Sequence, residues 1–139
     1  MPVSFRILPE RGLVYVRYTG RAAVADSTTA FAQYAAHPDF APGQKQLVDL
    51  SGVTDMERDF PALMAHQAQK AAAFMPAGAQ ALMVYFAPTE IAQRMARTIL
   101  RSWDGIDAVA AVLTEDEAQA LSILGLPETG FDELLPPVR

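Results

Sequence analysis

Several side chains capable of acid–base chemistry fall between residues 49 and 66 of this 139-residue chain. Asp49 ends a short apolar run, Asp55 and Asp59 follow it, and His66 comes later in the same stretch. An imidazole close to a carboxylate is a common arrangement for a general base, so a hydrolase using Asp49, Asp55 or His66 is one hypothesis. The chain has no cysteine and no Gly-x-Ser-x-Gly motif, so no nucleophile in a recognisable context accompanies these residues. We therefore expect a protein that is not an enzyme.

A second group of residues with chemical potential consists of three arginines, Arg94, Arg97 and Arg101. Their spacing places them along one side of an expected helix, with Glu90 nearby. Arginine side chains aligned in this way can receive a phosphate or an acidic partner, so we consider them a candidate anion-binding face. The alternative is an ordinary solvated helix face.

Absent motifs exclude several classes of function. The chain has no glycine-rich phosphate loop and no dinucleotide fingerprint, so we expect no nucleotide cofactor. With two histidines and no cysteine, a zinc site would depend on carboxylates, and we expect no metal. The net charge of −5 makes nucleic acid an unsuitable partner, because such binding neutralises phosphates with basic residues. No apolar run is long enough to span a membrane and the N-terminus lacks a signal-peptide pattern, so a cytoplasmic location is expected.

The apolar periodicity predicts one domain over residues 1–139 with five strands and four helices. Strands are expected at residues 3–8, 13–18, 46–50, 81–86 and 106–113, and helices at about 23–36, 58–74, 90–103 and 117–124. A proline–glycine turn at residues 9–12 makes the first two strands an antiparallel hairpin. The later alternation of strands and helices predicts parallel pairing, so we expect a mixed, mostly parallel α/β sheet in the order ββαβαβαβα.

Two local features complete this prediction. Residues 114–117, Thr-Glu-Asp-Glu, have the pattern of a capping box, in which Thr114 would begin the fourth helix. The proline-containing tail, residues 126–139, is expected to lie over the surface.

The junction after the third strand is the candidate site, because ligands in open α/β sheets bind where strand ends meet helix N-termini. The candidate docking or ligand surface consists of Asp49, Ser51, Thr54, Asp55, Glu57, Arg58 and Asp59. The hydroxyl residues Ser51 and Thr54 are expected in the loop before the helix. The alternative is that these acidic residues only stabilise a helix N-terminus, whose dipole favours negative charge.

Three segments, "ERGLVYVRYTG", "HPDFAPG" and "LVDLSGVT", together with the order of elements, resemble the SpoIIAA-like proteins of the STAS superfamily. The resemblance extends from Phe5 to about Leu124. It implies a STAS-like fold and a regulatory or interaction module that acts by contact with a protein partner, which the sequence does not identify. Small STAS-like domains often pair through exposed edge strands, so a homodimer is a further expectation.

The family's regulatory members carry a phosphorylated serine at the start of the helix after this strand. At the matching positions this chain has Glu57, Arg58 and Asp59, none of which has a hydroxyl. The resemblance therefore implies a module without the usual phosphorylatable serine.

A carrier of a lipid or another small apolar molecule is the alternative function. Part of the wider group is likened to CRAL-TRIO lipid-binding domains, and this reading predicts a pocket between the sheet and the second and third helices. The chain looks too short to enclose a long acyl chain. Methionines that could line a small pocket, or that could simply fill the core, are Met56, Met64, Met75, Met83 and Met95.

Overall fold

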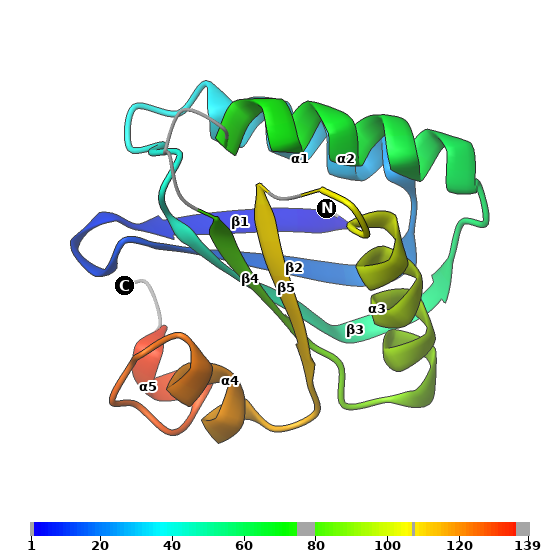
Figure 1. The fold of residues 1–139 in the computed structure, drawn as a ribbon. Coiled ribbons are helices and arrows are strands. Elements are labelled where there is room, and N and C mark those ends of the chain that lie inside the picture. The colour runs from blue at the N-terminus through cyan, green and yellow to red at the C-terminus, as the bar shows by residue number, and fades with distance from the viewer. Residues whose placement is uncertain (1, 75–79, 107, 136–139) are drawn as a thin grey trace.

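The computed structural model describes residues 2–74, 80–106 and 108–135 (Figure 1). The strands are β1 (Val3–Leu8), β2 (Leu13–Ala22), β3 (Lys45–Met56), β4 (Ala81–Phe86) and β5 (Val109–Thr114). The helices are the 3₁₀ turn η1 (Pro9–Arg11), α1 (Val24–Ala35), α2 (Phe60–Phe74), α3 (Glu90–Ser102), α4 (Glu117–Ile123) and α5 (Phe131–Leu134). Among the described residues, no helix is both long and apolar enough to cross a membrane.

The strands form a single mixed sheet in the order β1-β2-β3-β4-β5. β1 and β2 are antiparallel, and every other neighbouring pair is parallel. The predicted α/β class and the antiparallel N-terminal hairpin are therefore confirmed. The hairpin turns at Gly12, whose φ of 59° lies in the left-handed region that glycine adopts without a steric penalty.

The third strand is longer than the sequence predicts. β3 continues to Met56 because β2, which extends to Ala22, offers it a parallel partner past Gly52. The pairing is irregular there, and a β-carbon on Gly52 would lie 3.0 Å from the Tyr18 carbonyl oxygen, so a glycine allows the close approach. The prediction that Ser51 and Thr54 belong to a loop is wrong, because both lie within β3.

Each face of the sheet supports its own apolar cluster. One cluster joins the sheet to α1, α2 and α3, and the other joins it to α4 and α5. Figure 1 shows α1 and α2 above the sheet and α4 and α5 below it. Val48 and Val84 are both buried, as expected for strands that are covered on both faces.

The C-terminal tail belongs to the second cluster. Phe131 and Leu134 on α5 are both buried, and the Phe131 ring lies 4.9 Å from the ring of Phe86, centroid to centroid. The prediction of a tail lying over the surface is therefore wrong for the described residues 126–135. The predicted capping box is also wrong, because the N-cap of α4 is Asp116, while Glu117 accepts a hydrogen bond from the Phe131 N–H at 2.7 Å.

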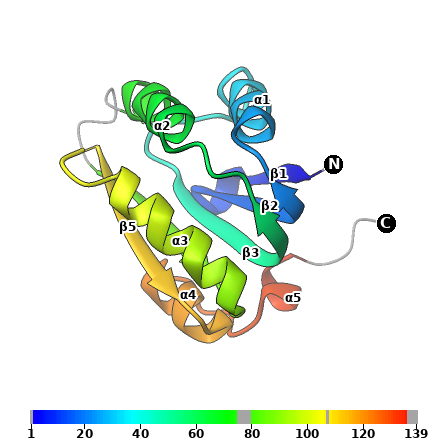
Figure 2. The same ribbon diagram turned by 90° about the vertical axis from the view of Figure 1, so that its right-hand side faces the viewer.

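Helix α2 differs from its neighbours in how it is held. Its main contacts with other elements are to α1 and α3 rather than to any strand. Figure 2 shows α1 and α2 side by side above the sheet, with α3 lying along it. Because α2 bridges two helices instead of resting on the strands, the space beneath it is the part of this face where a cavity can form.

A candidate ligand-binding cavity under helix α2

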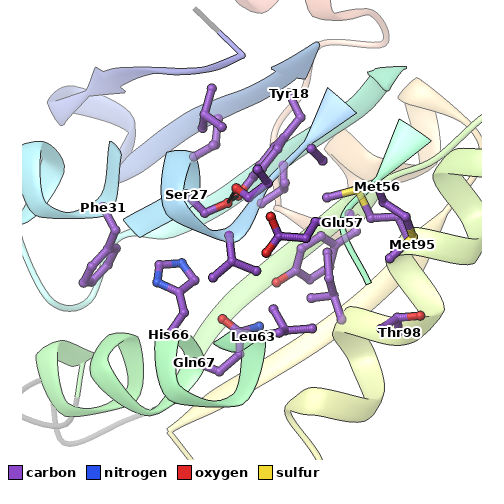
Figure 3. Close-up of a pocket in the computed structure, with 18 of the residues that line it drawn as sticks. Tyr18, Ser27, Phe31, Met56, Glu57, Leu63, His66, Gln67, Met95 and Thr98 are labelled. Atoms are coloured by element: carbon purple, nitrogen blue, oxygen red, sulfur yellow. Dashed lines mark hydrogen bonds between the residues drawn. The ribbon is translucent and has the colours of Figure 1, made fainter. Parts of the chain in front are cut away.

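A cavity of about 400 Å³ lies between the sheet and helices α1, α2 and α3 (Figure 3). Its lining is mainly apolar, with contributions from Val3, Val16, Val48, Leu63, Met95 and Ile99. Exposed residues at its edge include Arg58, Asp59 and Phe60, so the cavity opens near the start of α2. Small-molecule sites in proteins typically occupy about 300–1,000 Å³, and this cavity falls within that range.

Strand alternation decides which residues of β3 reach the cavity. Successive side chains of a strand point to opposite faces of its sheet. Gln46 and Val48 line the cavity, whereas Leu47 belongs to the apolar cluster on the other face. Asp49, at the next position, also points away from the cavity.

Helix α2 presents a stripe of four residues to the cavity: Leu63, His66, Gln67 and Lys70. Their spacing places them on one face of the helix. Three of the four are polar or titratable, which is unusual for the side of a helix that faces an apolar space. Of the four, the prediction from sequence singled out only His66, as a possible general base. The signal in the sequence was these polar residues at helical spacing within an otherwise apolar helix.

Gln67 is almost completely buried, with 2% of its surface exposed, and its Oε1 atom has no hydrogen-bond partner among the described residues. Its Nε2 atom donates to the Ser102 hydroxyl at 3.0 Å, and that hydroxyl in turn donates to the Ile99 carbonyl. Since the hydroxyl hydrogen is already used, Ser102 must accept from Gln67, and this fixes the orientation of the amide. Gln67 therefore offers a free acceptor to the cavity. Figure 3 shows its side chain directed from α2 toward the centre of the space.

A second unpaired amide lies on the opposite wall. Gln46 on β3 is 3% exposed, and within the described part of the chain its Nε2 atom has no hydrogen-bond partner. Leaving a buried donor or acceptor unpaired costs roughly 1–3 kcal/mol. The cavity therefore contains two buried polar atoms that the residues described in the structure leave without a hydrogen bond.

Lys70 is the one lysine among the described residues of the lining. Its Nζ atom lies 5.9 Å from the centroid of the Phe31 ring and 5.6 Å from that of Trp103. Burial lowers the pKa of Lys70 to about 8. Within the described part of the chain, no carboxylate comes within ion-pair distance of Lys70. The aromatic rings supply its electrostatic partners.

His66 is buried between α1 and α2, and its ring lies 6.0 Å from that of Phe31. Burial, and next the charge of Lys70, lower the pKa of His66 to about 4, so the imidazole is neutral at pH 7. Its Nδ1 atom lies 3.4 Å from the Thr28 hydroxyl, which donates its hydrogen to the Val24 carbonyl. Asp59, the carboxylate considered as its partner, instead accepts from the Ala62 N–H at 3.0 Å and caps α2.

The predicted docking surface divides into separate parts. Glu57, Arg58 and Asp59 lie together at the edge of the cavity, and Figure 3 shows the Glu57 side chain turned toward its interior. Thr54 is exposed, and Asp55 forms an exposed ion pair with Arg21 at 3.7 Å.

Asp49 and Ser51 form a separate hydrogen-bonded cluster away from this edge. The Asp49 carboxylate is buried and accepts from the Tyr15 hydroxyl, from the Ser51 N–H at 2.9 Å and from the Ser51 hydroxyl at 2.6 Å. Burial and the neighbouring Asp49 carboxylate both raise the pKa of Tyr15. The Asp49 carboxylate therefore has a structural role, because it links β3 to the Tyr15 hydroxyl on β2.

The three arginines of the predicted anion-binding face are also not equivalent. Arg94 and Arg101 lie on the cavity lining, whereas Arg97 does not. Arg94 donates to Glu90 at 2.7 Å, which partly neutralises it, and Arg101 donates to Thr98 at 3.4 Å. Two of the three side chains therefore flank the cavity.

The methionines also separate into different environments. Met56 and Met95 line the cavity, Met83 is fully buried in the core, and Met64 is half-buried outside the lining. Met75 lies outside the described residues. Among the residues described, no three His, Asp or Glu side chains are grouped so that they could hold a metal ion.

Comparison with models of known protein families gives no match for this chain, and no curated protein sequence matches it. The cavity and its chemistry are therefore the features of this chain that bear on its function.

Proposed function

We propose that this protein binds a small, mainly apolar molecule in the cavity under α2 and serves as its carrier or sensor. The observation that supports this proposal is the cavity of about 400 Å³ with its apolar lining. Protein interiors are close-packed, and voids larger than a few water molecules are rare. By the scale measured for core cavities, about 24 cal/mol per Å³, a sealed void of this size would cost roughly 10 kcal/mol. An opening to solvent and an occupying ligand both reduce that cost.

The proposed activity is binding without a catalytic step. His66 hydrogen-bonds to Thr28, and Asp59 caps a helix, so the two do not act as an acid–base pair. The SpoIIAA-like relationship to the STAS superfamily is part of the proposal, and the order of strands and helices supports it.

A dye-binding assay tests this function. The neutral apolar dye Nile red should bind the purified protein, and native mass spectrometry should detect small molecules that co-purify with it. A Leu63→Trp substitution enlarges a side chain on the cavity wall and should weaken dye binding by about tenfold or more, since excess volume in a filled space costs roughly 1–3 kcal/mol. Ala65→Trp is the matched control, because Ala65 is exposed on the same helix outside the lining. Equal dye binding by both variants, or none by the wild type, would refute the proposal.

A protein-contact module is the second candidate, and the exposed side chain of Phe60 favours it. This residue is 45% exposed at the start of α2, beside Arg58 and Asp59. Large apolar side chains beside charged ones are typical of contact surfaces. Light scattering compared between the wild type and a Phe60→Ser variant tests whether the contact is with a second copy of this chain. Monomers in both samples would exclude contact with a second copy of this chain.

A further inference from the structure

The Lys70 end of the cavity has a polar character that its apolar lining does not explain. Gln67 and Lys70 are three residues apart on α2, so their side chains lie close together on the cavity face of the helix. One offers an unpaired hydrogen-bond acceptor, and the other offers a positive charge without a carboxylate partner in the described part of the chain. The unpaired amide N–H of Gln46 lies on the facing strand.

These groups define what a complementary ligand must carry. The Lys70 ammonium requires an anion, and the Gln67 Oε1 atom requires a hydrogen-bond donor. The Gln46 amide can donate a further hydrogen bond to an oxygen atom of the anion. A simple alkane satisfies none of these groups, and a plain carboxylate leaves the Gln67 acceptor unpaired.

We propose that the ligand is an amphipathic carboxylate with a hydroxyl or amide N–H group close to the carboxylate, as in a medium-chain beta-hydroxy acid. Its head lies between Lys70 and Gln67, and its apolar chain extends along α2 toward Leu63. Leu63 and Lys70 are about 10 Å apart along the helix axis. Glu57 is a lining residue that precedes α2, and Leu63 is nearer the start of this helix than Lys70, so the uncharged chain and not the carboxylate head extends toward Glu57. This inference rests on the proposed function and specifies its ligand class.

The test compares three probes of equal chain length: decanol, decanoate and beta-hydroxydecanoate. Each displaces Nile red from the wild-type protein, and the displacement curves give relative affinities. Decanoate should bind about tenfold more tightly than decanol, the ratio expected for a hydrogen bond to a charged group. Beta-hydroxydecanoate should bind a further three- to tenfold more tightly, because its hydroxyl pairs with Gln67.

Variants assign each preference to its residue. Lys70→Met should abolish the preference for decanoate over decanol, and Lys70→Arg, which keeps the charge, should retain it. Gln67→Met should abolish only the additional preference for the hydroxy acid. The matched controls are Arg97→Met and Gln69→Met, which remove an exposed arginine of α3 and an exposed glutamine of α2, both outside the lining. Both controls should keep the wild-type order of affinities.

Trp103 locates the bound head group. It is the only tryptophan of the chain and lies beside Lys70, so decanoate should change its fluorescence more than decanol does. Equal binding of all three probes by the wild type, or an unchanged decanoate preference in Lys70→Met, would overturn the ligand class while leaving apolar binding in place. Failure of Nile red and of every probe to bind would overturn the proposed function itself.

Discussion

The buried imidazole of His66 makes the stability of the fold depend on pH. In the folded protein its pKa is lowered to about 4, first by burial and next by the charge of Lys70. In the unfolded chain the pKa returns to about 6.5. Above pH 6.5 the imidazole is neutral in both states, so it contributes no pH dependence. As the pH falls from 6.5 toward 4, the unfolded chain takes up a proton that the folded protein does not, and the folded state loses stability.

The size of this effect follows from the two pKa values. One pH unit within the window corresponds to about 1.4 kcal/mol, so the full window is worth roughly 3 kcal/mol. Between pH 7 and pH 5 the loss should be about 2 kcal/mol. This narrower interval is the useful one, because carboxylates titrate increasingly at lower pH.

Denaturant unfolding of the wild type and of His66→Gln at pH 7 and pH 5 measures this loss. The wild type should lose about 2 kcal/mol more than the variant, whose amide does not titrate. His37→Gln is the control, since it removes the other histidine and leaves His66 in place. Lys70→Met should reduce the wild-type loss, because it removes the second cause of the lowered pKa of His66. The same pH dependence in the wild type and in His66→Gln would refute the reasoning.

Two further predictions concern the other face of the sheet. Phe131→Ala should destabilise the protein by about 3 kcal/mol because it opens a cavity against the Phe86 ring, whereas Phe60→Ala, at an exposed position, should change the unfolding free energy by less than about 1 kcal/mol. Similar small effects in both variants would show that α5 is not part of the core. Asp49→Asn should cost about 2 kcal/mol, because one of the carboxylate oxygens that accept from Tyr15 and Ser51 is replaced by a donor group. The control Asp55→Asn, at an exposed position, should lower the free energy of unfolding by less than about 1 kcal/mol. An Asp49→Asn variant as stable as this control would contradict the structural role of Asp49.

The fold was predictable where short-range patterns and long-range pairing agree. The proline–glycine turn at residues 9–12 brings β1 and β2 together, and the apolar run of β4 requires cover on both faces. The alternation of later strands with helices implies parallel order, which the sheet has. In these segments each local preference is also what the tertiary structure requires.

The errors occur where a distant partner decides the structure. Ser51 and Thr54 lie in a strand because β2 is long enough to pair with them, and nothing near them in the sequence indicates the length of β2. Glu117 had the position of a capping residue, but its carboxylate bonds to the Phe131 N–H instead. Burial of Phe131 against Phe86 holds the tail in the core. Helical periodicity alone carries no information about such contacts.

The candidate site was predicted only in part, for a related reason. The edge residues Glu57, Arg58 and Asp59 follow a strand, so the general rule for α/β sheets located them. The inner residues Gln67 and Lys70 lie within the mainly apolar helix α2, and no motif marks them. Polar side chains on the side of a helix that faces the core conflict with the usual apolar pattern. A functional site is expected where a sequence departs from such a local pattern.

The conflict on α2 also connects the stability of the protein to its proposed function. An unpaired buried polar atom costs roughly 1–3 kcal/mol, and a domain of this size is stable by only about 5–15 kcal/mol. Methionine at position 67 would fill similar space without an unpaired oxygen, so stability alone favours the apolar residue there. The chain instead has a glutamine whose amide is held in one orientation by Ser102. Among the described residues, the Gln67 acceptor has no hydrogen-bond partner and the Lys70 ammonium has no carboxylate partner, which lowers the stability of the empty protein. The proposed ligand, which supplies both a hydrogen-bond donor and a negative charge, would offset that loss.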